Sequence, residues 1–305
     1  MNVNLSVEIA GIKMQNPVMP ASGTFGYGEE YAGLVNISKL GAVVTKGVTV
    51  KPREGNPQPR IWETPAGMIN NIGLENPGLD IVIKEKIPFL SQFGVPIIVN
   101  ICGERMRDYI ILAAKLNLVE EVSGLEVNIS CPNVKKGGMS FGQDPKITGK
   151  LIGELRDITD LPLIVKLTPN VTDIVSVAKA AINAGADAIS LINTVRARAK
   201  IRSGPHNGKW IIGGLSGPCV KPVALQKIAE IREAGLDIPI VGMGGITNLQ
   251  DALEFFEAGV DAIAVGTATF VNPKTMEGII HGLEKYMKDQ KITSLDELRE
   301  KIKRR

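Results

Sequence analysis

The chain has 305 residues, of which 44% are hydrophobic and 22% are charged, and its formal net charge is only +3. This balance is typical of an ordinary globular protein. It gives no reason to expect a nucleic-acid partner, because the basic residues from Arg196 to Arg202 and in the tail Lys301–Arg305 are not interleaved with aromatic side chains. No run reaches the roughly 18 apolar residues of a membrane span, and no secretion signal is visible, so we expect a cytoplasmic protein.

The first segment alternates apolar and polar residues from Asn4 to Met14 and carries Gly11 at a turn, which predicts a hairpin at about residues 1–15. Eight short apolar runs follow, and each leads through a polar or glycine residue into a segment with helical spacing. The runs are Asn16–Ser22, Gly41–Lys46, Pro96–Asn100, Leu125–Asn128, Leu163–Lys166, Ala188–Asn193, Ile240–Gly245 and Ala262–Gly266.

This order predicts a (β/α)8 barrel, because parallel strands that are buried on both faces need crossover helices. One helix is expected after Asp173, where Val175, Ala178, Ala181 and Ile182 have helical spacing. Barrels often exceed the usual length of one domain, and no linker is visible, so we expect a single domain over residues 1–305 with a C-terminal helical extension. A doubly wound open sheet is the alternative.

The active site of such a barrel lies at the carboxyl ends of its strands. The polar residues that close the runs are therefore candidate ligands or catalysts, namely Ser22, Lys46, Asn100, Asn128, Lys166 and Asn193. A lysine that closes an apolar strand is costly to bury without an anionic partner. For Lys46 and Lys166 we expect that partner to be a delocalised negative charge, such as a reduced flavin or a substrate carboxylate. A single asparagine at a strand end is more often a turn or cap residue.

The three cysteines have different surroundings in the sequence. Cys102, Cys131 and Cys219 contain no pair at metal-ligand spacing, so we expect no metal site, disulfide framework or iron-sulfur cluster in this chain. Cys102 and Cys219 are interpreted as small buried hydrophobic residues. Cys131 follows a strand end and precedes Pro132 and several glycines, which predicts a thiol on a mobile lid loop at about residues 131–142.

Glycines cluster at three turns near the end of the chain. Gly242–Gly245 closes the seventh run, Gly266 and Thr267 close the eighth, and Gly213–Gly217 precedes a helix that is expected to start near Pro218. One glycine after a strand usually marks only a turn. Three such turns, at the positions where barrels hold phosphate, predict an anion site made of backbone amides.

These residues match a known family over nearly the whole chain. The sequence resembles the class 1 dihydroorotate dehydrogenases, which are flavin mononucleotide (FMN) enzymes of pyrimidine synthesis. The matching segments are Pro20–Phe25, Lys46–Gly47, Asn70–Gly78, Asn128–Asn133, Lys166–Asn170, Ile192–Thr194, Gly213–Pro218, Gly244–Gly245 and Gly266–Thr267. A cysteine at position 131 resembles class 1, and the segments around Leu74–Asp80 and Gly213–Pro218 resemble its NAD-linked subclass.

The resemblance implies a role for each matching residue. Cys131 would be the base that takes a proton from C5 of dihydroorotate while hydride leaves C6 for the flavin. Lys46 would contact flavin and substrate, and Lys166 would contact the flavin ring. The implied substrate residues also include Asn70, Asn71, Ile72, Gly73, Leu74, Asn128, Asn193 and Thr194. The implied FMN residues also include Ser22, Gly47, Asn100, Asn128, Ile192, Gly217, Gly244, Gly245, Gly266 and Thr267.

The resemblance also implies partners. The NAD-linked subclass works with a second subunit that carries FAD and a [2Fe-2S] cluster, and its catalytic chains form a homodimer within a heterotetramer. One stretch departs from the family, because residues 195–210 are strongly basic where a moderately apolar loop is usual. His206 in this stretch is interpreted as a solvated loop residue, and His281 as part of a C-terminal helix far from the strand ends.

Other functions stay open from the sequence. Residues 142–145 and 167–174 also resemble the flavin domain of dihydropyrimidine dehydrogenases, whereas the Ile72–Pro77 turn favours dihydroorotate. A barrel isomerase or aldolase would use the glycine turns to hold a substrate phosphate. A catalytically silent flavin-binding scaffold for a partner subunit is a third possibility.

Overall fold

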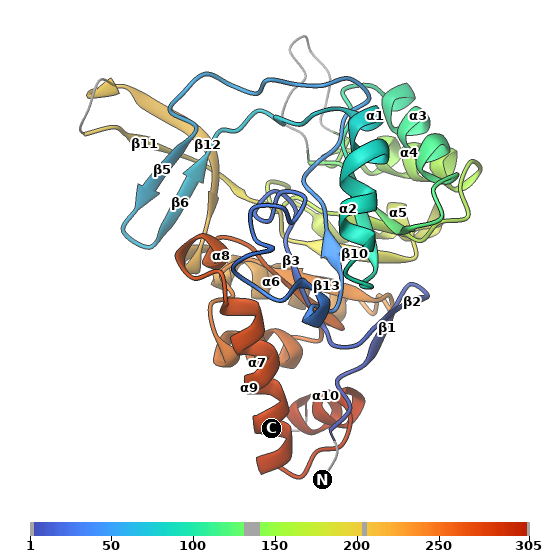
Figure 1. Ribbon diagram of the computed structural model, residues 1–305, viewed down its shortest axis with the longest axis vertical. Coiled ribbons are helices and arrows are strands. Elements are labelled where there is room, and N and C mark those ends of the chain that lie inside the picture. Colours follow the sequence, from blue (N-terminus) through green and yellow to red (C-terminus); the bar gives the residue numbers. More distant parts are fainter. Residues whose placement is uncertain (1–2, 131–140, 203–205, 304–305) are drawn as a thin grey trace.

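The computed structural model describes residues 3–130, 141–202 and 206–303 (Figure 1). Its centre is an eight-stranded sheet in which all neighbouring strands are parallel. The strand order is β3 (Val18–Pro20), β14 (Ala262–Val265), β13 (Ile240–Met243), β10 (Ala188–Leu191), β9 (Leu163–Lys166), β8 (Val122–Asn128), β7 (Ile97–Ile101) and β4 (Val43–Val44). Each of the eight predicted runs overlaps one of these strands, although β7 ends one residue after its run and β8 begins three residues before its run, and the barrel prediction is confirmed.

The sheet closes where its two edge strands, β3 and β4, approach each other. The Gly41 amide donates to the Val18 carbonyl at 2.8 Å. A Cβ atom on Gly41 would lie 2.0 Å from the Asn16 carbonyl oxygen, so a residue with a side chain would push these segments apart. Gly41 therefore permits the close approach that turns the sheet into a barrel.

A short hairpin covers the amino-terminal end of the barrel, as predicted. Strands β1 (Val7–Ile9) and β2 (Ile12–Met14) are antiparallel and turn at Ala10 and Gly11, which both have positive φ. The hairpin side chains Ile9, Ile12 and Met14 belong to the same buried apolar cluster as the barrel interior. This cluster fills the lower half of the barrel and leaves the opposite end for polar chemistry.

Helices surround the strands. They are α1 (Leu79–Ile81), a π-helical segment (Val82–Lys86), α2 (Ile87–Ser91), α3 (Met106–Leu116), α4 (Pro145–Arg156), α5 (Ile174–Asn183), α6 (Lys221–Glu233), α7 (Leu249–Glu257), α8 (Ala268–Val271), α9 (Thr275–Asp289) and α10 (Leu295–Lys303). α9 and α10 form the C-terminal extension, and the Asn4 amide donates to the Thr293 carbonyl, which ties the two ends of the chain together. His281 lies on α9, as expected.

The helical face after Asp173 was predicted only in part. Asp173 caps α5 by accepting a hydrogen bond from the Ser176 amide at 3.0 Å. Ala178 and Ala181 are fully buried, as expected, but Ile174 and Val177 complete the buried face, and Val175 and Ile182 lie at its edge.

Helices do not alternate with strands throughout the chain, and this expectation was wrong at three places. In one of them, the connection from β4 to β7, residues 61–64 and 67–70 form two antiparallel strands before the helix. The connection from β3 to β4 contains a single 3-10 turn, Ile37–Lys39, because Gly23, Gly26 and Gly28 adopt positive φ and break any helix before it. The connection after β10 forms two antiparallel strands before its helix begins.

These two strands belong to a second sheet that projects from the barrel (Figure 1). Its order is β11 (Val195–Lys200), β12 (Trp210–Ser216), β6 (Gly67–Asn70) and β5 (Ile61–Thr64), and all neighbours are antiparallel. The first part of the basic stretch, residues 195–200, is therefore a strand rather than a loop. It turns Arg196, Arg198 and Lys200 to solvent, and the Arg198 guanidinium lies over the Trp210 ring at 4.8 Å.

Candidate active site

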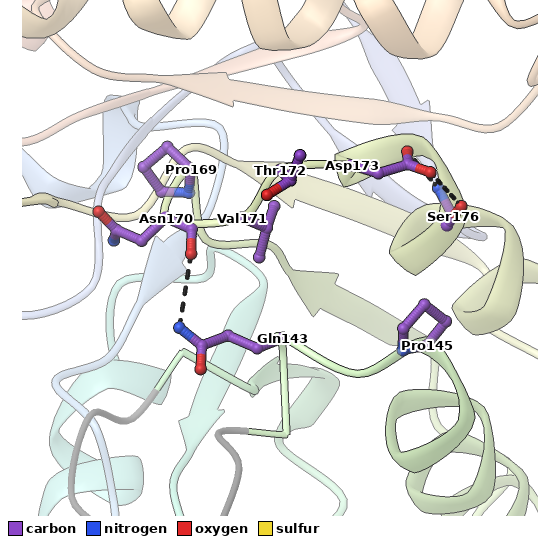
Figure 2. Close-up of a pocket in the computed structure, with 8 residues that line it drawn as sticks. All are labelled: Gln143, Pro145, Pro169, Asn170, Val171, Thr172, Asp173 and Ser176. Atoms are coloured by element: carbon purple, nitrogen blue, oxygen red, sulfur yellow. Dashed lines mark hydrogen bonds between the residues drawn. The ribbon is translucent and has the colours of Figure 1, made fainter.

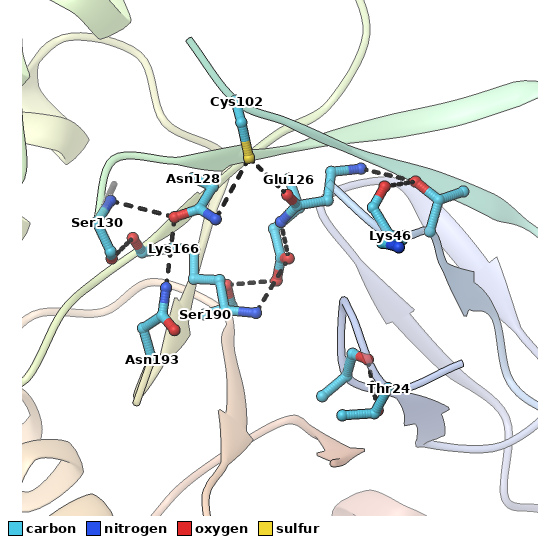
Figure 3. Close-up of polar contacts among 12 residues, drawn as sticks. Thr24, Lys46, Cys102, Glu126, Asn128, Ser130, Lys166, Ser190 and Asn193 are labelled. Atoms are coloured by element: carbon cyan, nitrogen blue, oxygen red, sulfur yellow. Dashed lines mark hydrogen bonds and ion pairs between the residues drawn. The ribbon is translucent and has the colours of Figure 1, made fainter. Parts of the chain in front are cut away.

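A buried polar layer crosses the upper part of the barrel (Figure 3). Its side chains come one each from β7, β8, β9 and β10, namely Asn100, Glu126, Lys166 and Ser190, and each is at most 4% exposed. Glu126 accepts hydrogen bonds from Asn100 Nδ2 at 2.5 Å and from Ser190 Oγ at 2.8 Å. Lys166 Nζ lies 3.3 Å from Glu126 Oε2. The strands thus bring two predicted flavin residues, Asn100 and Lys166, onto one carboxylate.

Glu126 is an anionic partner of Lys166 within the chain itself. It lies on the adjacent strand, and the expected contact of Lys166 with a bound flavin or substrate stays a prediction. Glu126 lies inside the run Leu125–Asn128, so a prediction based on the residues that close each run does not include it. A charged residue inside an apolar run, between Leu125 and Val127, was the available signal.

A cluster of amides lies directly above this layer, at the strand ends. Asn128 Nδ2 lies 3.4 Å from Cys102 Sγ, and Asn128 Oδ1 accepts from Asn193 Nδ2 at 3.4 Å and from the Ser130 amide at 3.1 Å. Asn128 and Asn193 were both predicted to bind substrate, and they meet at one point of the rim. Cys102 is buried, as expected, but its thiol also lies 3.2 Å from Asn100 Oδ1, so it links the amide cluster to the polar layer.

Cys131 and most of the predicted lid, residues 131–140, lie outside the described residues. The segments on both sides are held together at the end of β8. The Gly142 amide donates to the Ile129 carbonyl at 2.9 Å, and Tyr109 Oη donates to the Asn128 carbonyl at 2.7 Å. The Tyr109 ring also packs edge-on against Phe141. The described ends of this segment therefore adjoin the amide cluster.

Lys46 stands at the barrel mouth on the other side. Its side chain is 26% exposed, and its Nζ lies 3.8 Å from Glu75 Oε2, which accepts a closer hydrogen bond from Arg60 Nη1 at 2.7 Å. Glu75 is thus only a long, partly solvated partner of Lys46, and the expected contact of Lys46 with a ligand stays a prediction. The next residue, Gly47, permits close packing, because a Cβ atom there would lie 2.9 Å from Cys102 Sγ.

The predicted substrate turn, residues 70–74, starts at the end of β6. Asn70 Nδ2 donates to the Gly214 carbonyl at 3.1 Å, which fixes the turn to β12. Asn71 Oδ1 accepts from Asn56 Nδ2 at 2.7 Å, and Gly73 and Leu74 both have positive φ. Ile72 is half-buried. The second sheet thus positions this turn, through a pairing between residues far apart in the sequence.

Thr194 is held by a residue that the sequence interpretation did not single out. Asn170 Nδ2 donates to the Thr194 carbonyl at 3.0 Å, and Asn170 Oδ1 accepts from the Arg196 amide at 2.8 Å. One side chain therefore joins the end of β9 to the start of β11. Asn170 ends the segment Lys166–Asn170, which carries part of the family resemblance, and this place in the sequence could have pointed to a role in the site.

The glycine turns converge, as the phosphate prediction requires. Gly217, Gly244 and Gly245 all have positive φ, and a Cβ atom on Gly245 would lie 3.0 Å from the Gly217 carbonyl oxygen. The end of β12 also meets the end of β14, where Thr267 Oγ1 donates to Ser216 Oγ at 2.7 Å. Gly213 and Gly214 lie within β12 rather than in a loop. Three other predicted FMN residues lie at neighbouring strand ends, namely Ser22, Ile192 and Gly266.

Lys221, at the start of α6, fixes the turn that contains Gly244 and Gly245. Its Nζ lies 2.7 Å from both Asp251 Oδ1 and Glu254 Oε2 on α7. Asp251 Oδ2 accepts from the Thr247 amide at 2.8 Å and from Thr247 Oγ1 at 2.6 Å. Burial alone would raise the pKa of Asp251, but the hydrogen bonds from Lys221 and Thr247 outweigh it and lower that pKa. The same contacts raise the pKa of Lys221.

The hydrogen bonds on Asp251 predict that part of the stability of the fold is lost at low pH. A carboxyl group whose pKa is lowered in the folded state adds stability above its unfolded pKa of about 3.9, and that stability is lost as pH falls through the lower folded value. Asp251→Asn should therefore lower the thermal midpoint at pH 7, by the equivalent of about 1–3 kcal/mol, and the difference from the parent protein should shrink towards pH 3. Asp296→Asn, at an 86% exposed side chain, is the control. A difference that stays constant with pH would contradict the assignment.

Cys219 is exposed, and the interpretation of it as a buried hydrophobic residue was wrong. It lies in the 3-10 turn Pro218–Val220, between β12 and α6. Its amide donates to the Ala66 carbonyl at 3.1 Å, so the backbone is fixed while the thiol lies at the surface.

An open pocket of about 740 Å³ adjoins the ends of β9 and α4 (Figure 2). Gln143 Nε2 donates to the Asn170 carbonyl at 3.4 Å across it. The lining residues are Gln143, Pro145, Pro169, Asn170, Val171, Thr172, Asp173 and Ser176. None of them is a predicted site residue, but Asn170 also holds Thr194, so this pocket adjoins the candidate site.

The described part of the chain contains neither a metal-holding cluster nor a membrane-spanning helix. Among these residues, no group of three or more His, Cys, Asp or Glu side chains could hold a metal ion. No helix within the described ranges is both long and apolar enough to cross a bilayer.

Comparison with known proteins gives one consistent family. A family model described as dihydroorotate dehydrogenase matches residues 4–287. The relative named dihydroorotate dehydrogenase B (NAD(+)), catalytic subunit, from Geotalea daltonii is 51% identical over 299 residues, which are 97% of each chain. Proteins of the same name from Caldicellulosiruptor bescii and a Thermoanaerobacter species are 51% and 49% identical over 297 residues, which are 97% of this chain and 98% of theirs.

Proposed function

This chain belongs to the dihydroorotate dehydrogenase family, and we propose that it oxidises dihydroorotate to orotate in pyrimidine synthesis. The observation that carries the proposal is the amide cluster of Asn128 and Asn193 at the rim, next to Ser130. Orotate is a planar ring with amide groups and a carboxylate. Asparagine side chains suit such a ring because they offer donors and acceptors without net charge.

The residues present fit FMN. Gly217, Gly244 and Gly245 have positive φ, and Cβ atoms on them would crowd neighbouring protein atoms, so glycine lets these turns pack together where barrels hold a phosphate group. Asn100 and Lys166, in the polar layer, would face the flavin ring. The remaining residues that would hold FMN are Ser22, Lys46, Gly47, Asn128, Ile192, Gly266 and Thr267. Bound there, FMN would supply the hydride acceptor that no side chain can provide.

The chain's own residues would divide the remaining work. Cys131 would take the proton from C5 of dihydroorotate and release it to solvent after orotate leaves. Lys46, at the barrel mouth and partly exposed, would bind the substrate carboxylate. Asn128, Asn193 and Thr194 would hold the ring amides, and the turn of Asn70, Asn71, Ile72, Gly73 and Leu74 would wrap the substrate. The lid at 131–142 would exclude water during the reaction.

The electrons would leave through a second protein. The relatives are named catalytic subunits, which supports a separate partner subunit for this chain. We propose that this partner carries FAD and a [2Fe-2S] cluster, passes the electrons to NAD+, and joins a homodimer of this chain in a heterotetramer. The cytoplasmic location expected from the composition stays a prediction.

An anaerobic titration tests the proposed function. The purified chain should be yellow, and dihydroorotate should bleach the flavin absorbance at about one equivalent per chain, whereas dihydrouracil should leave it unchanged. Bleaching by dihydrouracil alone would assign the chain to a dihydropyrimidine dehydrogenase activity instead. A colourless protein would contradict the flavin, and a yellow protein that neither compound bleaches would indicate a silent scaffold.

A further inference from the structure

We propose that Glu126 is a positioning residue for the reaction, which holds the Lys166 ammonium below the barrel mouth and cancels its charge. Glu126 is not among the residues expected to touch substrate or flavin. It acts through its neighbours in the polar layer. The part of this inference that concerns FMN rests on the proposed function, and the part that concerns Lys166 stands without it.

The contacts of Glu126 require a carboxylate. Both of its oxygens receive hydrogen bonds, from Ser190 Oγ on Oε1 and from Asn100 Nδ2 and Lys166 Nζ on Oε2. The Asn100 amide nitrogen and the lysine ammonium can only donate, and an ionised carboxylate is a side chain that only accepts. A glutamine here could accept from Asn100 and Lys166 only if its amide nitrogen turned towards Ser190 Oγ, and its neutral oxygen would still leave the Lys166 charge uncancelled.

The ion pair between Glu126 and Lys166 is buried. The Glu126 and Lys166 side chains are 3% and 5% exposed. One layer deeper, the inward-facing residues of β7, β9 and β10 are Ile98, Ile164 and Ala188. They belong to the buried apolar cluster that fills the lower half of the barrel. Removing one charge from a buried pair leaves the other uncompensated, which is costly, whereas replacing both charges is often tolerated.

The position of Glu126 links it to the reaction. Two of its three donors, Asn100 and Lys166, are expected FMN residues, and Asn100 Oδ1 also meets Cys102 Sγ below the amide cluster. With Glu126 ionised, this layer carries no net charge. Without it, a full positive charge would face the ring and would favour the reduced, anionic form of the flavin over the oxidised form.

The first experiment measures the thermal midpoint of the flavin-free chain and requires no activity assay. Glu126→Gln and Lys166→Met should each lower the thermal midpoint, and the double variant should recover at least half of the loss caused by Glu126→Gln. If Glu126→Gln does not fold, the recovery of a folded protein in the double variant is the result to seek. A double variant that is no more stable than Glu126→Gln would overturn the pairing.

The second experiment measures the midpoint potential of bound FMN by equilibration with a reference dye. Glu126→Gln should shift it to more positive values, by at least a tenfold preference for reduced FMN, which is about 30 mV for a two-electron couple. Ser190→Ala removes one hydrogen bond to Glu126 without changing the charge, and should shift the potential by much less.

A third comparison tests whether Lys166 mediates the effect. In the Lys166→Met background, a buried carboxylate without a cation takes up a proton, so adding Glu126→Gln should leave the potential unchanged. A shift of equal size in both backgrounds, or no positive shift in either, would overturn the proposal. If no form of the protein binds FMN, the proposed function fails, while the stability comparison still decides the pairing of Glu126 with Lys166.

Discussion

Cys131→Ala should lose nearly all turnover with dihydroorotate while it keeps its flavin and still binds orotate. Proton transfer by a positioned side chain typically contributes a factor of about 10² to 10⁴ to the rate. Orotate binding should persist, because we propose that Asn128, Asn193 and Lys46 hold orotate and that the thiol does not. Stopped-flow measurement of flavin bleaching would give the rate, and the spectral shift caused by orotate would give the affinity.

Two further measurements separate this role from a general effect of removing a thiol. Cys219→Ala is the matched control, because its exposed thiol makes one long hydrogen bond of 3.8 Å, to the Ser216 carbonyl, among the described residues. In the parent protein, bleaching should accelerate as pH rises towards the ordinary thiol pKa of about 8.5, because the thiolate is the proposed base. Bleaching by Cys131→Ala at the parent rate would remove Cys131 from the mechanism.

The barrel could be predicted because each of its strands is encoded by a short continuous stretch of sequence. Each strand is a short apolar run, such as Leu163–Lys166, and the parallel arrangement follows from the segments between the runs. The second sheet could not be predicted in this way, because β6 pairs with β12 across more than 140 residues of chain. Residues 195–200 form a strand with alternating exposure, whereas the family resemblance predicted a loop at this place.

The candidate site could be predicted where strand ends define it. The barrel brings Asn100, Asn128, Lys166 and Asn193 to one end, so their convergence follows from the fold. What the sequence left out is the arrangement of charge. Glu126 lies inside a strand, and it changes the expected role of Lys166 from a free cation to half of an ion pair.

Lys46→Ala should weaken orotate binding and slow flavin reduction together, because the ammonium is expected to contact both molecules. A hydrogen bond to a charged group contributes about 1.5–3 kcal/mol, which corresponds to roughly a 10- to 150-fold weaker affinity for orotate. The fold should be unaffected. The contact between Lys46 Nζ and Glu75 is 3.8 Å long and partly exposed, and such pairs contribute about 0–1 kcal/mol.

The local structure lets this test distinguish the ligand role from a structural one. Arg60 Nη1 still binds Glu75 at 2.7 Å when Lys46 is removed, so the carboxylate keeps a partner and the neighbouring turn keeps its anchor. Lys51→Ala, at an exposed lysine on the same connection, is the matched control. Loss of orotate affinity in Lys46→Ala at an unchanged thermal midpoint would establish a direct contact. Parent-like affinity and reduction rate would instead leave Lys46 as a surface partner of Glu75, and the substrate carboxylate would then need another cation at the barrel mouth.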